Sequence, residues 1–271
     1  MSRPLLVTGG SGYLGGALLA QASSPVVGTH LRGESVELTR LDVRDADATA
    51  ALVALLRPTA VVHTAYVQDG PEAWATNVEG SRNVATAAAR AGLRLVHVST
   101  DVVFDGLKGS PYDESDEPHP VTDYGRSKLE AERAVLDAHP DALVVRTSLM
   151  VGAPEPGRQE RGVLAAARGE VPGAVFFDDE LRSPLLVADL ARALLELAGR
   201  PQITGLLHLG GPESLSRYEL ACRIAAARGL AADRIARGSV ADSGLVRPMD
   251  CTLDSSLARG LLASPIGPVR P

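Results

Sequence analysis

The sequence predicts an α/β fold built on a doubly wound parallel sheet. Short apolar runs typical of buried strands alternate with longer helical runs over the first two thirds of the chain. A glycine-rich turn at residues 9–15 joins the first of these strands to the first helix. Several strands are apolar on both faces, as in parallel sheets covered by helices on each side. Such alternation indicates right-handed crossovers between parallel strands.

Composition limits the class of partner. The chain has 271 residues, 45% of them hydrophobic, and a net charge of −6. It has no basic run, so small molecules are expected as partners rather than nucleic acid or membrane. No apolar run reaches membrane-spanning length and no signal-peptide pattern is present, so we expect a cytoplasmic protein. The sequence leaves the oligomeric state open, with a homodimer as one alternative. Cys222 and Cys251 are too few for a disulfide framework, and the six histidines lack metal-site spacing.

The glycine turn predicts a nucleotide cofactor. A strand is expected over residues 3–8 and a helix from the turn to about residue 22. Glycine at 9, 12 and 15 allows a tight turn, close approach of the backbone to a pyrophosphate, and close helix packing. The spacing is one residue longer than the usual dinucleotide fingerprint. The expected cofactor contacts here are Gly9, Ser11, Gly12, Tyr13, Leu14 and Gly15.

The end of the second strand, residues 26–30, bears on which cofactor binds. An Asp or Glu there would bind the free 2′-hydroxyl of NAD. Arg32 follows this strand instead and can pair with a 2′-phosphate, so NADP(H) is favoured and NAD(H) is the alternative. A third strand is expected to end at Asp42 and Val43, which would flank adenine. Asp42 can equally cap the helix that begins near residue 45.

The next strand and helix supply further polar candidates. Ligands of parallel sheets bind beyond the carboxyl ends of the strands. The strand expected over residues 59–65 would therefore present Thr64, Ala65 and Tyr66 to the cofactor. A helix expected over residues 71–91 carries Asn77. Asparagine is a poor helix former, so Asn77 either has a polar role near Lys128, such as bonding backbone or water, or is simply exposed.

The candidate chemistry lies between residues 99 and 128. A helix expected over 121–139 carries Tyr124 and Lys128 four residues apart, on one face. A tyrosine pKa is ordinarily about 10, and the charge of Lys128 would lower it. A hydroxyl at the end of the strand over 93–99, Thr100 or Ser99, would hold the same carbonyl oxygen. The three groups predict proton exchange with a ketone or alcohol.

Lysine usage strengthens this interpretation. A Tyr and a Lys four residues apart also occur as surface decoration. However, only Lys108 and Lys128 are lysines among 27 basic residues, so arginine serves wherever a cation alone is needed. Lysine is the cation whose compact ammonium fits behind a phenol.

The rest of the chain is expected to form a small C-terminal α/β substrate lobe. A strand over 143–147 leads to Leu149, expected to face nicotinamide and substrate. Residues 152–173 enclose an Arg- and Glu-rich helix that is either a lid or a solvated connection. Arg182 and Arg247 are candidates for a diphosphate clamp, or for surface ion pairs. The expected dinucleotide-binding domain is 1–150 plus about 185–205, and the substrate lobe is about 151–184 and 206–271.

Several motifs together resemble one superfamily. They are the glycine turn, STDVVFDG at 99–106, PY at 111–112 and YGRSK at 124–128. The set is similar to the extended short-chain dehydrogenase/reductases, and more narrowly to their dTDP-4-dehydrorhamnose reductase branch. That branch also includes the regulatory beta subunit of methionine adenosyltransferase. SRYELA at 216–221 and RP at 247–248 match its C-terminal pattern, so the resemblance covers nearly the whole chain.

The resemblance implies an NAD(P)-binding Rossmann fold and reduction of the 4-keto group of a nucleotide-linked deoxysugar. It gives Thr100 the hydroxyl role, Tyr124 the acid/base role, and Lys128 the tasks of lowering the tyrosine pKa and binding nicotinamide ribose. Asn77 matches a fourth polar position of the superfamily. The candidate substrate contacts are Asn77, Asp101, Leu149 and Arg182.

Two departures from the branch leave alternatives open. Leu149 stands where the reductases commonly place a tryptophan, and DELRSPL at 179–185 replaces their D-Q-x-G-x-P-T pattern. A cofactor-binding regulatory subunit that docks to a partner enzyme is the first alternative function. A sugar nucleotide epimerase is the second. A dehydratase is disfavoured, because Asp101 is followed by Val102 and not by a second carboxylate.

Overall fold

The chain folds into two compact units built from interleaved segments. The structure is a computed structural model that describes residues 3–33 and 35–270. The first unit comprises the residues up to Thr100 with Asp123–Arg146 and Leu190–Leu207, and the second comprises Asp101–Thr122, Thr147–Asp189 and the residues from His208 onward. The outer limits of the two expected domains, residues 1 and 271, lie outside the described residues.

The segment 101–122, expected in the first domain, packs with the second unit. Tyr112 forms a parallel bridge with Leu253, and the backbone nitrogen of Asp250 donates to the carbonyl oxygen of Gly106 at 3.1 Å. Gly106 has a φ of +81°, and a Cβ there would lie 2.4 Å from the nitrogen of Met249. This close approach requires glycine.

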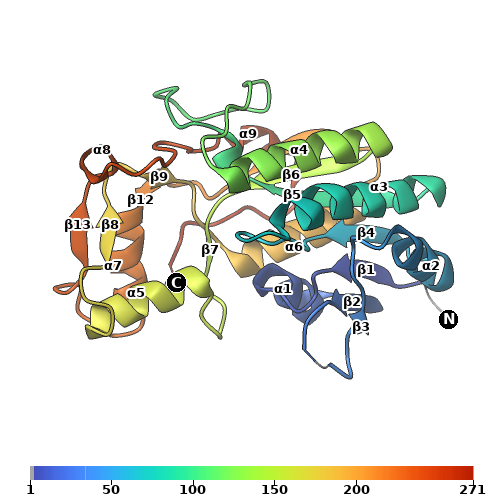
Figure 1. The fold of residues 1–271 in the computed structure, drawn as a ribbon, viewed down its shortest axis with the longest axis horizontal. Coiled ribbons are helices and arrows are strands. Elements are labelled where there is room, and N and C mark those ends of the chain that lie inside the picture. Colours follow the sequence, from blue (N-terminus) through green and yellow to red (C-terminus); the bar gives the residue numbers. More distant parts are fainter. Residues whose placement is uncertain (1–2, 34, 271) are drawn as a thin grey trace. The chain divides into compact units, whose positions relative to one another are not determined.

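A seven-stranded sheet is the centre of the first unit (Figure 1), in the order β11-β6-β5-β4-β1-β2-β3. The pairs β1–β2, β1–β4, β2–β3 and β4–β5 are parallel. The strand order reverses between β1 and β4, as in a doubly wound fold, so the predicted fold class is confirmed. The strands are β1 Leu5–Thr8, β2 Val26–His30, β3 Thr39–Arg40, β4 Ala60–His63, β5 Arg94–Thr100, β6 Leu143–Thr147 and β11 Gly205–Leu209.

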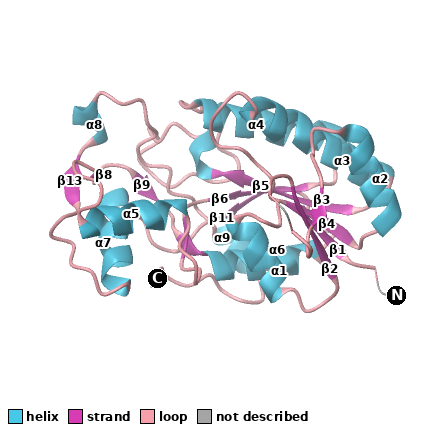
Figure 2. Cartoon of the chain, turned by 60° about the horizontal axis from the view of Figure 1, so that its bottom comes forward, coloured by secondary structure: helices cyan, strands magenta, loops and turns pink. Residues whose placement is uncertain are grey.

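Helices cover both faces of this sheet (Figures 1 and 2). Helices α2, Ala46–Leu56, α3, Gly80–Arg90, and α4, Asp123–Ala138, lie on one face, whereas α1, Tyr13–Gln21, and α6, Val187–Ala198, lie on the other. The helix expected over 71–91 is interrupted, because a π-helical turn at Ala75–Glu79 precedes α3. Within the described residues, no helix combines the length and apolar character needed to cross a membrane.

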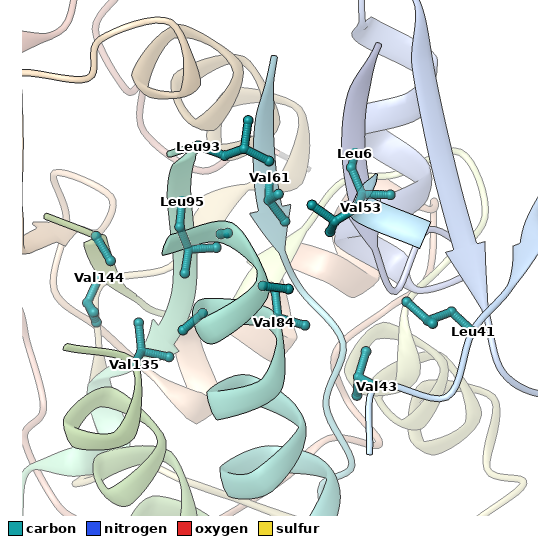
Figure 3. Close-up of a cluster of buried hydrophobic side chains, with 14 residues drawn as sticks. Leu6, Leu41, Val43, Val53, Val61, Val84, Leu93, Leu95, Val135 and Val144 are labelled. Atoms are coloured by element: carbon teal, nitrogen blue, oxygen red, sulfur yellow. The ribbon is translucent and has the colours of Figure 1, made fainter. Parts of the chain in front are cut away.

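One core cluster of the first unit lies between the sheet and helices α2 to α4 (Figure 3). Each fully buried Val or Leu side chain contributes about 1.5–3 kcal/mol. Strands and helices both supply such side chains, which explains why the strands are apolar on this face. Labelled members are Leu6, Leu41, Val43, Val53, Val61, Val84, Leu93, Leu95, Val135 and Val144.

The second unit has a core of its own. Helix α5, Arg158–Arg168, packs against α7, Arg217–Ala227, through Val163, Leu164 and Ile224, all at most 5% exposed. Residues 152–173 are therefore not a merely solvated connection, because the apolar face of α5 is part of this core. Ser216 caps α7, since its side chain accepts from the backbone nitrogen of Glu219 at 3.0 Å.

Short strands and helices complete the second unit. β8, Val175–Phe177, pairs in parallel with β13, Ala236–Gly238, and β9, Leu181–Arg182, pairs antiparallel with β12, Leu215–Ser216. β7, Met150–Val151, pairs in parallel with β10, Leu185–Leu186. Helices α8, Val240–Ser243, and α9, Ser256–Leu261, also belong to this unit.

Candidate active site

Tyr124 and Lys128 lie one turn apart on α4, in the first unit. Lys128 is 3% exposed, and its Nζ donates to the carbonyl oxygen of Val98 in β5 at 2.7 Å. Tyr124 is half-buried. Thr100 is the last residue of the same strand and is 9% exposed. The bond between Lys128 and Val98 thus ties the helix that carries the phenol to the strand that ends in the threonine.

The surroundings of Lys128 change its pKa. Burial lowers the pKa of Lys128 to about 8, and the nearby carboxylate of Glu132 opposes this effect. Burial also lowers the pKa of His63 to about 3 and that of His97 far below its usual range, with a further contribution from Lys128. Both imidazoles are therefore neutral near pH 7. Both histidines are buried within strands, His63 in β4 and His97 in β5.

A buried ion pair, which the sequence pattern did not predict, lies beside Lys128. Both carboxylate oxygens of Glu132 accept from Arg146, whose Nη2 lies 2.7 Å from Oε2 and whose Nε lies 3.0 Å from Oε1. Ser99 Oγ donates to the same carboxylate. Ser99 is thus committed to Glu132, which leaves Thr100 as the candidate hydroxyl. The available signal was Arg146 itself, since a charge within an apolar strand requires a partner.

Asn77 is buried and bonds backbone, which confirms the polar role considered for it. Its side chain accepts from the nitrogen of Val67 and donates to the oxygen of Val67, both at 2.8 Å. Its Nδ2 also donates to Ser127 Oγ at 2.9 Å, and Ser127 donates to the carbonyl oxygen of Tyr124 at 2.8 Å. This chain of bonds joins the segment after β4 to the first turn of α4. The role of Ser127 was not anticipated.

The glycine turn is as tight as its spacing predicted. Gly9 has a φ of +73°, and a Cβ there would lie 2.8 Å from the backbone of Ala65. A Cβ on Gly15 would lie 2.1 Å from the carbonyl oxygen of Gly9. Gly12, the N-cap of α1, has no side chain to occupy the helix N-terminus, where backbone N–H groups attract anions. Leu14, by contrast, has its side chain in the interior, 5% exposed.

A basic hollow lies at the end of β2. Arg32 is exposed and donates to Glu72 at 2.5 Å, so in this structure its charge is paired across the surface. Arg40, at the end of β3, is a second guanidinium in the same hollow. It was not predicted from the sequence, because the third strand was expected to run on to residue 43. The lining residues are His30, Leu31, Arg32, Gly33, Ser35, Leu38 and Arg40.

Asp42 and Val43 follow β3 and do not end it. Asp42 accepts from the backbone nitrogen and guanidinium of Arg44, and these hydrogen bonds lower its pKa. Asp45 and not Asp42 caps α2, accepting from the nitrogen of Ala48 at 2.9 Å. Val43 is 4% exposed and packs in the core, so its side chain does not flank a ligand. An apolar residue after a strand fits either role, and only packing separates them.

The residues after β4 lie close to the glycine turn. Thr64 Oγ1 donates to the carbonyl oxygen of Thr8 at 2.8 Å, and Ala65 lies directly under Gly9. Tyr66 is 49% exposed. Its ring centroid lies 5.8 Å from that of Tyr124. The structure therefore groups this segment with the turn and the phenol, as its position at the carboxyl end of a strand predicted.

The proposed substrate contacts of the second unit have structural partners. Asp101 is 2% exposed and accepts from Ser148 Oγ at 2.5 Å. Leu149 packs partly against the second core. Arg182 is 2% exposed and donates to the carbonyl oxygens of Leu181 and Met249, each at 2.7 Å. The guanidinium of Arg182 is therefore enclosed by protein acceptors, which corrects its expected role in a diphosphate clamp.

Glu180 forms ion pairs with Arg182 and with two neighbouring arginines. It accepts from Arg182 at 3.1 Å, and its two carboxylate oxygens accept from Nε and Nη2 of Arg247 at 2.7 and 3.0 Å. Arg217 lies 3.9 Å away, and burial lowers its pKa to about 10. The expected ion pairing of Arg182 and Arg247 is thus observed, but Arg182 makes its pair in the interior and not at the surface.

Comparisons with known proteins agree over most of the chain. Residues 3–266 match the RmlD substrate binding domain family. The dTDP-4-dehydrorhamnose reductase of Mycobacterium tuberculosis is 40% identical over 234 residues, which cover 80% of this chain and 73% of that protein. The methionine adenosyltransferase 2 subunit beta of Bos taurus is 32% identical over 276 residues, which cover 94% of this chain and 81% of that protein.

Solved structures show the same fold. A hypothetical dTDP-4-dehydrorhamnose reductase from Sulfolobus tokodaii has a TM-score of 0.83 and 30% identity, covering 98% of this chain and 97% of its own. The dTDP-4-dehydrorhamnose reductase of Bacillus anthracis in complex with NADP has a TM-score of 0.85 and 24% identity, covering 99% and 96%. At 24% identity, the second likeness bears on the fold alone.

Proposed function

Because the chain belongs to the RmlD substrate binding domain family, we propose that it is an NADP(H)-dependent reductase of a keto group on a nucleotide-linked deoxysugar or a related polar ketone. The observation that carries the proposal is the buried Lys128 one turn from Tyr124, bonded to the strand that ends in Thr100. A buried ammonium beside a phenol favours the phenolate and so makes the tyrosine a usable acid and base near neutral pH.

The residues of the first unit fit a dinucleotide. The start of α1, which no side chain caps, suits a pyrophosphate. Gly9 and Gly15 keep the turn tight, because a Cβ at either position would clash with neighbouring backbone atoms. Arg32 and Arg40 suit a 2′-phosphate, because guanidinium binds phosphate with two parallel hydrogen bonds. These residues support NADP(H), with NAD(H) as the alternative.

In the proposed reaction each residue has one task. When bound, NADPH supplies the hydride. Tyr124 gives its phenolic proton to the carbonyl oxygen, and Thr100 holds that oxygen by a hydrogen bond. Lys128 stabilises the phenolate that remains. Asn77 and Ser127 fix the backbone around Tyr124 and take no part in the proton transfer.

The substrate class is supported by relatives and not by the predicted contacts in the second unit. The Mycobacterium tuberculosis relative is a dTDP-4-dehydrorhamnose reductase. Arg182 is enclosed by protein acceptors, but Arg247 keeps 39% of its side chain exposed. We therefore propose Arg247 in place of Arg182 as the cation available to a phosphorylated substrate.

Tyr124→Phe tests the proposal. The variant keeps the ring and loses the transferable proton, so we expect NADPH oxidation with a panel of dTDP-4-keto-6-deoxy sugars to stop. A thermal-shift titration should show cofactor binding close to that of the wild type, because a ligand of the folded state raises its stability. Tyr218→Phe, on α7, is the matched control and should retain activity. Unchanged turnover in Tyr124→Phe would refute the proposed role.

A regulatory subunit is the second candidate function, because the bovine relative is a methionine adenosyltransferase subunit and matches 94% of this chain. In that case Tyr124→Phe has no consequence for the partner's activity, and binding to a methionine adenosyltransferase catalytic subunit is the readout. Size-exclusion chromatography of the mixed proteins separates the two functions. A stable complex without NADPH oxidation on any sugar of the panel favours regulation.

A further inference from the structure

Two successive residues at the end of β5 are each fixed to α4. The carbonyl oxygen of Val98 accepts from Lys128, and the hydroxyl of Ser99 donates to Glu132. Lys128 and Glu132 are four residues apart, so they lie one turn apart on the same helix face. The next residue of the strand is Thr100. The strand end and the helix are therefore joined at two points next to the candidate hydroxyl.

Glu132 is itself held from a third element. Arg146, in β6, contacts both of its carboxylate oxygens, and the two side chains are 2% and 3% exposed. Taking two charges out of water costs free energy that their attraction only partly returns, so such a pair is weak evidence of stabilisation. A role for the pair beyond stability is therefore worth testing.

We propose that Glu132 is a positioning residue of the proposed reductase site, where its carboxylate stabilises the charged form of Lys128 and keeps the end of β5 in place against α4. This inference rests on the proposed function only for the identity of the reaction. The effect of Glu132 on Lys128 is a property of the folded protein and is measurable without substrate.

The charged and titratable groups that face Lys128 come from three elements. His63, on β4, and His97, on β5, are neutral near pH 7 because burial lowers the pKa of both. Tyr124 and Glu132 belong to α4 with Lys128 itself. Burial favours the neutral amine, and the carboxylate of Glu132 acts in the opposite direction. Arg146 faces Glu132 from the far side.

The lysine content makes a direct measurement simple. The chain has two lysines, Lys108 and Lys128, so NMR of the labelled Lys side chains gives two titration curves. Lys108 forms an ion pair with Asp116, and its pKa is raised, so it serves as an internal reference. In Glu132→Gln we expect the pKa of Lys128 to fall below about 8 by roughly one pH unit, the usual effect of a close opposite charge. The curve of Lys108 should not move.

A double variant separates this effect from loss of the ion pair. Glu132→Gln leaves Arg146 buried with a weaker partner, which destabilises the fold. Glu132→Leu combined with Arg146→Met removes both charges, so we expect the stability to return while the pKa of Lys128 stays low. Glu160→Gln is the matched control, since Glu160 is a glutamate 1% exposed in the second unit. A Lys128 titration unchanged in the double variant would overturn the proposal.

The kinetic readout is the pH profile of ketone reduction. With Lys128 less charged, the pKa of Tyr124 rises, so the alkaline limb of the profile should move to higher pH in both Glu132 variants. Cofactor affinity, measured by titration, should change little. A shifted Lys128 curve in a protein that reduces no ketone would confirm the effect of Glu132 on Lys128 and reject the reductase. Ketone reduction together with an unchanged Lys128 curve in the Glu132 variants would reject the proposed role of Glu132 and leave the reductase in place.

Discussion

The ring of Tyr66 lies against the ring of Tyr124, with centroids 5.8 Å apart and planes inclined at 52°. Tyr66 comes from the segment after β4, and the next residue, Val67, is held at both its nitrogen and its oxygen by the amide of Asn77. The phenol of the proposed acid is therefore oriented by the segment after β4 as well as by its own helix. Tilted aromatic pairs of this kind contribute about 0.5–1.5 kcal/mol.

Tyr66→Ala should therefore lower kcat clearly but lower the unfolding free energy only slightly. The side chain of Tyr66 is 49% exposed, so its removal costs little packing, but the ring of Tyr124 loses its neighbour. Tyr66→Phe keeps the ring and should behave like the wild type. Steady-state rates and urea unfolding of both variants provide the measurement. Equal losses of kcat in Ala and Phe would indicate that the hydroxyl, and not the ring contact, matters.

Two adjacent glycines of α1 should respond in opposite ways to alanine. A Cβ at Gly15 would lie 2.1 Å from the carbonyl oxygen of Gly9, so Gly15→Ala must displace the turn and should weaken NADPH binding as well as stability. At Gly16 the nearest atom would be 4.0 Å away. Gly16→Ala should thus raise the unfolding free energy by about 0.5–1 kcal/mol, the ordinary gain in a helix.

Thermal unfolding with and without NADPH measures both effects. The Gly16 variant controls for any general response of α1 to a methyl group. If the two variants bound NADPH equally well, the turn would not approach the pyrophosphate in the way we propose.

Sequence pattern could predict the sheet because each strand is a separate apolar run. The second and sixth strands were expected at residues 26–30 and 143–147, and β2 and β6 have these bounds. The glycine turn and the pair of Tyr124 and Lys128 could be predicted from the sequence, because residue spacing along one element fixes their geometry. The third strand was misjudged, since β3 has two residues and leaves no periodic signal.

What the sequence could not supply are pairs between distant elements. Glu132 and Arg146 lie fourteen positions apart on a helix and a strand, and only the packing of α4 on β6 brings them together. Likewise, the sequence offers Arg182 and Arg247 as equal candidates for an anion. The enclosure of Arg182 by carbonyl oxygens of Leu181, Pro248 and Met249 separates them, and this depends on the fold of the second unit.

The cofactor preference should depend on three charges near β2. Glu72 forms an ion pair with Arg32 in this structure, so Glu72→Gln should release the guanidinium and tighten NADPH binding. Arg40→Ser should weaken it roughly tenfold, the effect of losing a charge-assisted hydrogen bond of about 1.4 kcal/mol. NADH, which lacks the 2′-phosphate, should bind all variants alike. A parallel loss of NADH affinity in Arg40→Ser would place Arg40 elsewhere on the cofactor.

The buried Lys128 should make stability rise with pH. Its pKa is about 8 in the folded protein and 10.5 in the unfolded chain, so between these values the unfolded chain binds more protons. Unfolding free energy then increases with pH, by about 2–3 kcal/mol between pH 7 and 10. Lys128→Met lacks this contribution, so the wild type should gain on the variant over that interval.

Urea unfolding of wild type and Lys128→Met at pH 7 and at pH 10 tests the sign. Lys108→Met is the control, because the pKa of Lys108 is raised and its contribution is already present at low pH and lost only above 10.5. The difference in unfolding free energy between the wild type and Lys108→Met should therefore stay constant from pH 7 to pH 10. A difference between wild type and Lys128→Met that stayed constant from pH 7 to pH 10 would mean that Lys128 keeps an ordinary pKa. In that case burial would not be what sets the charge of Lys128 near Tyr124.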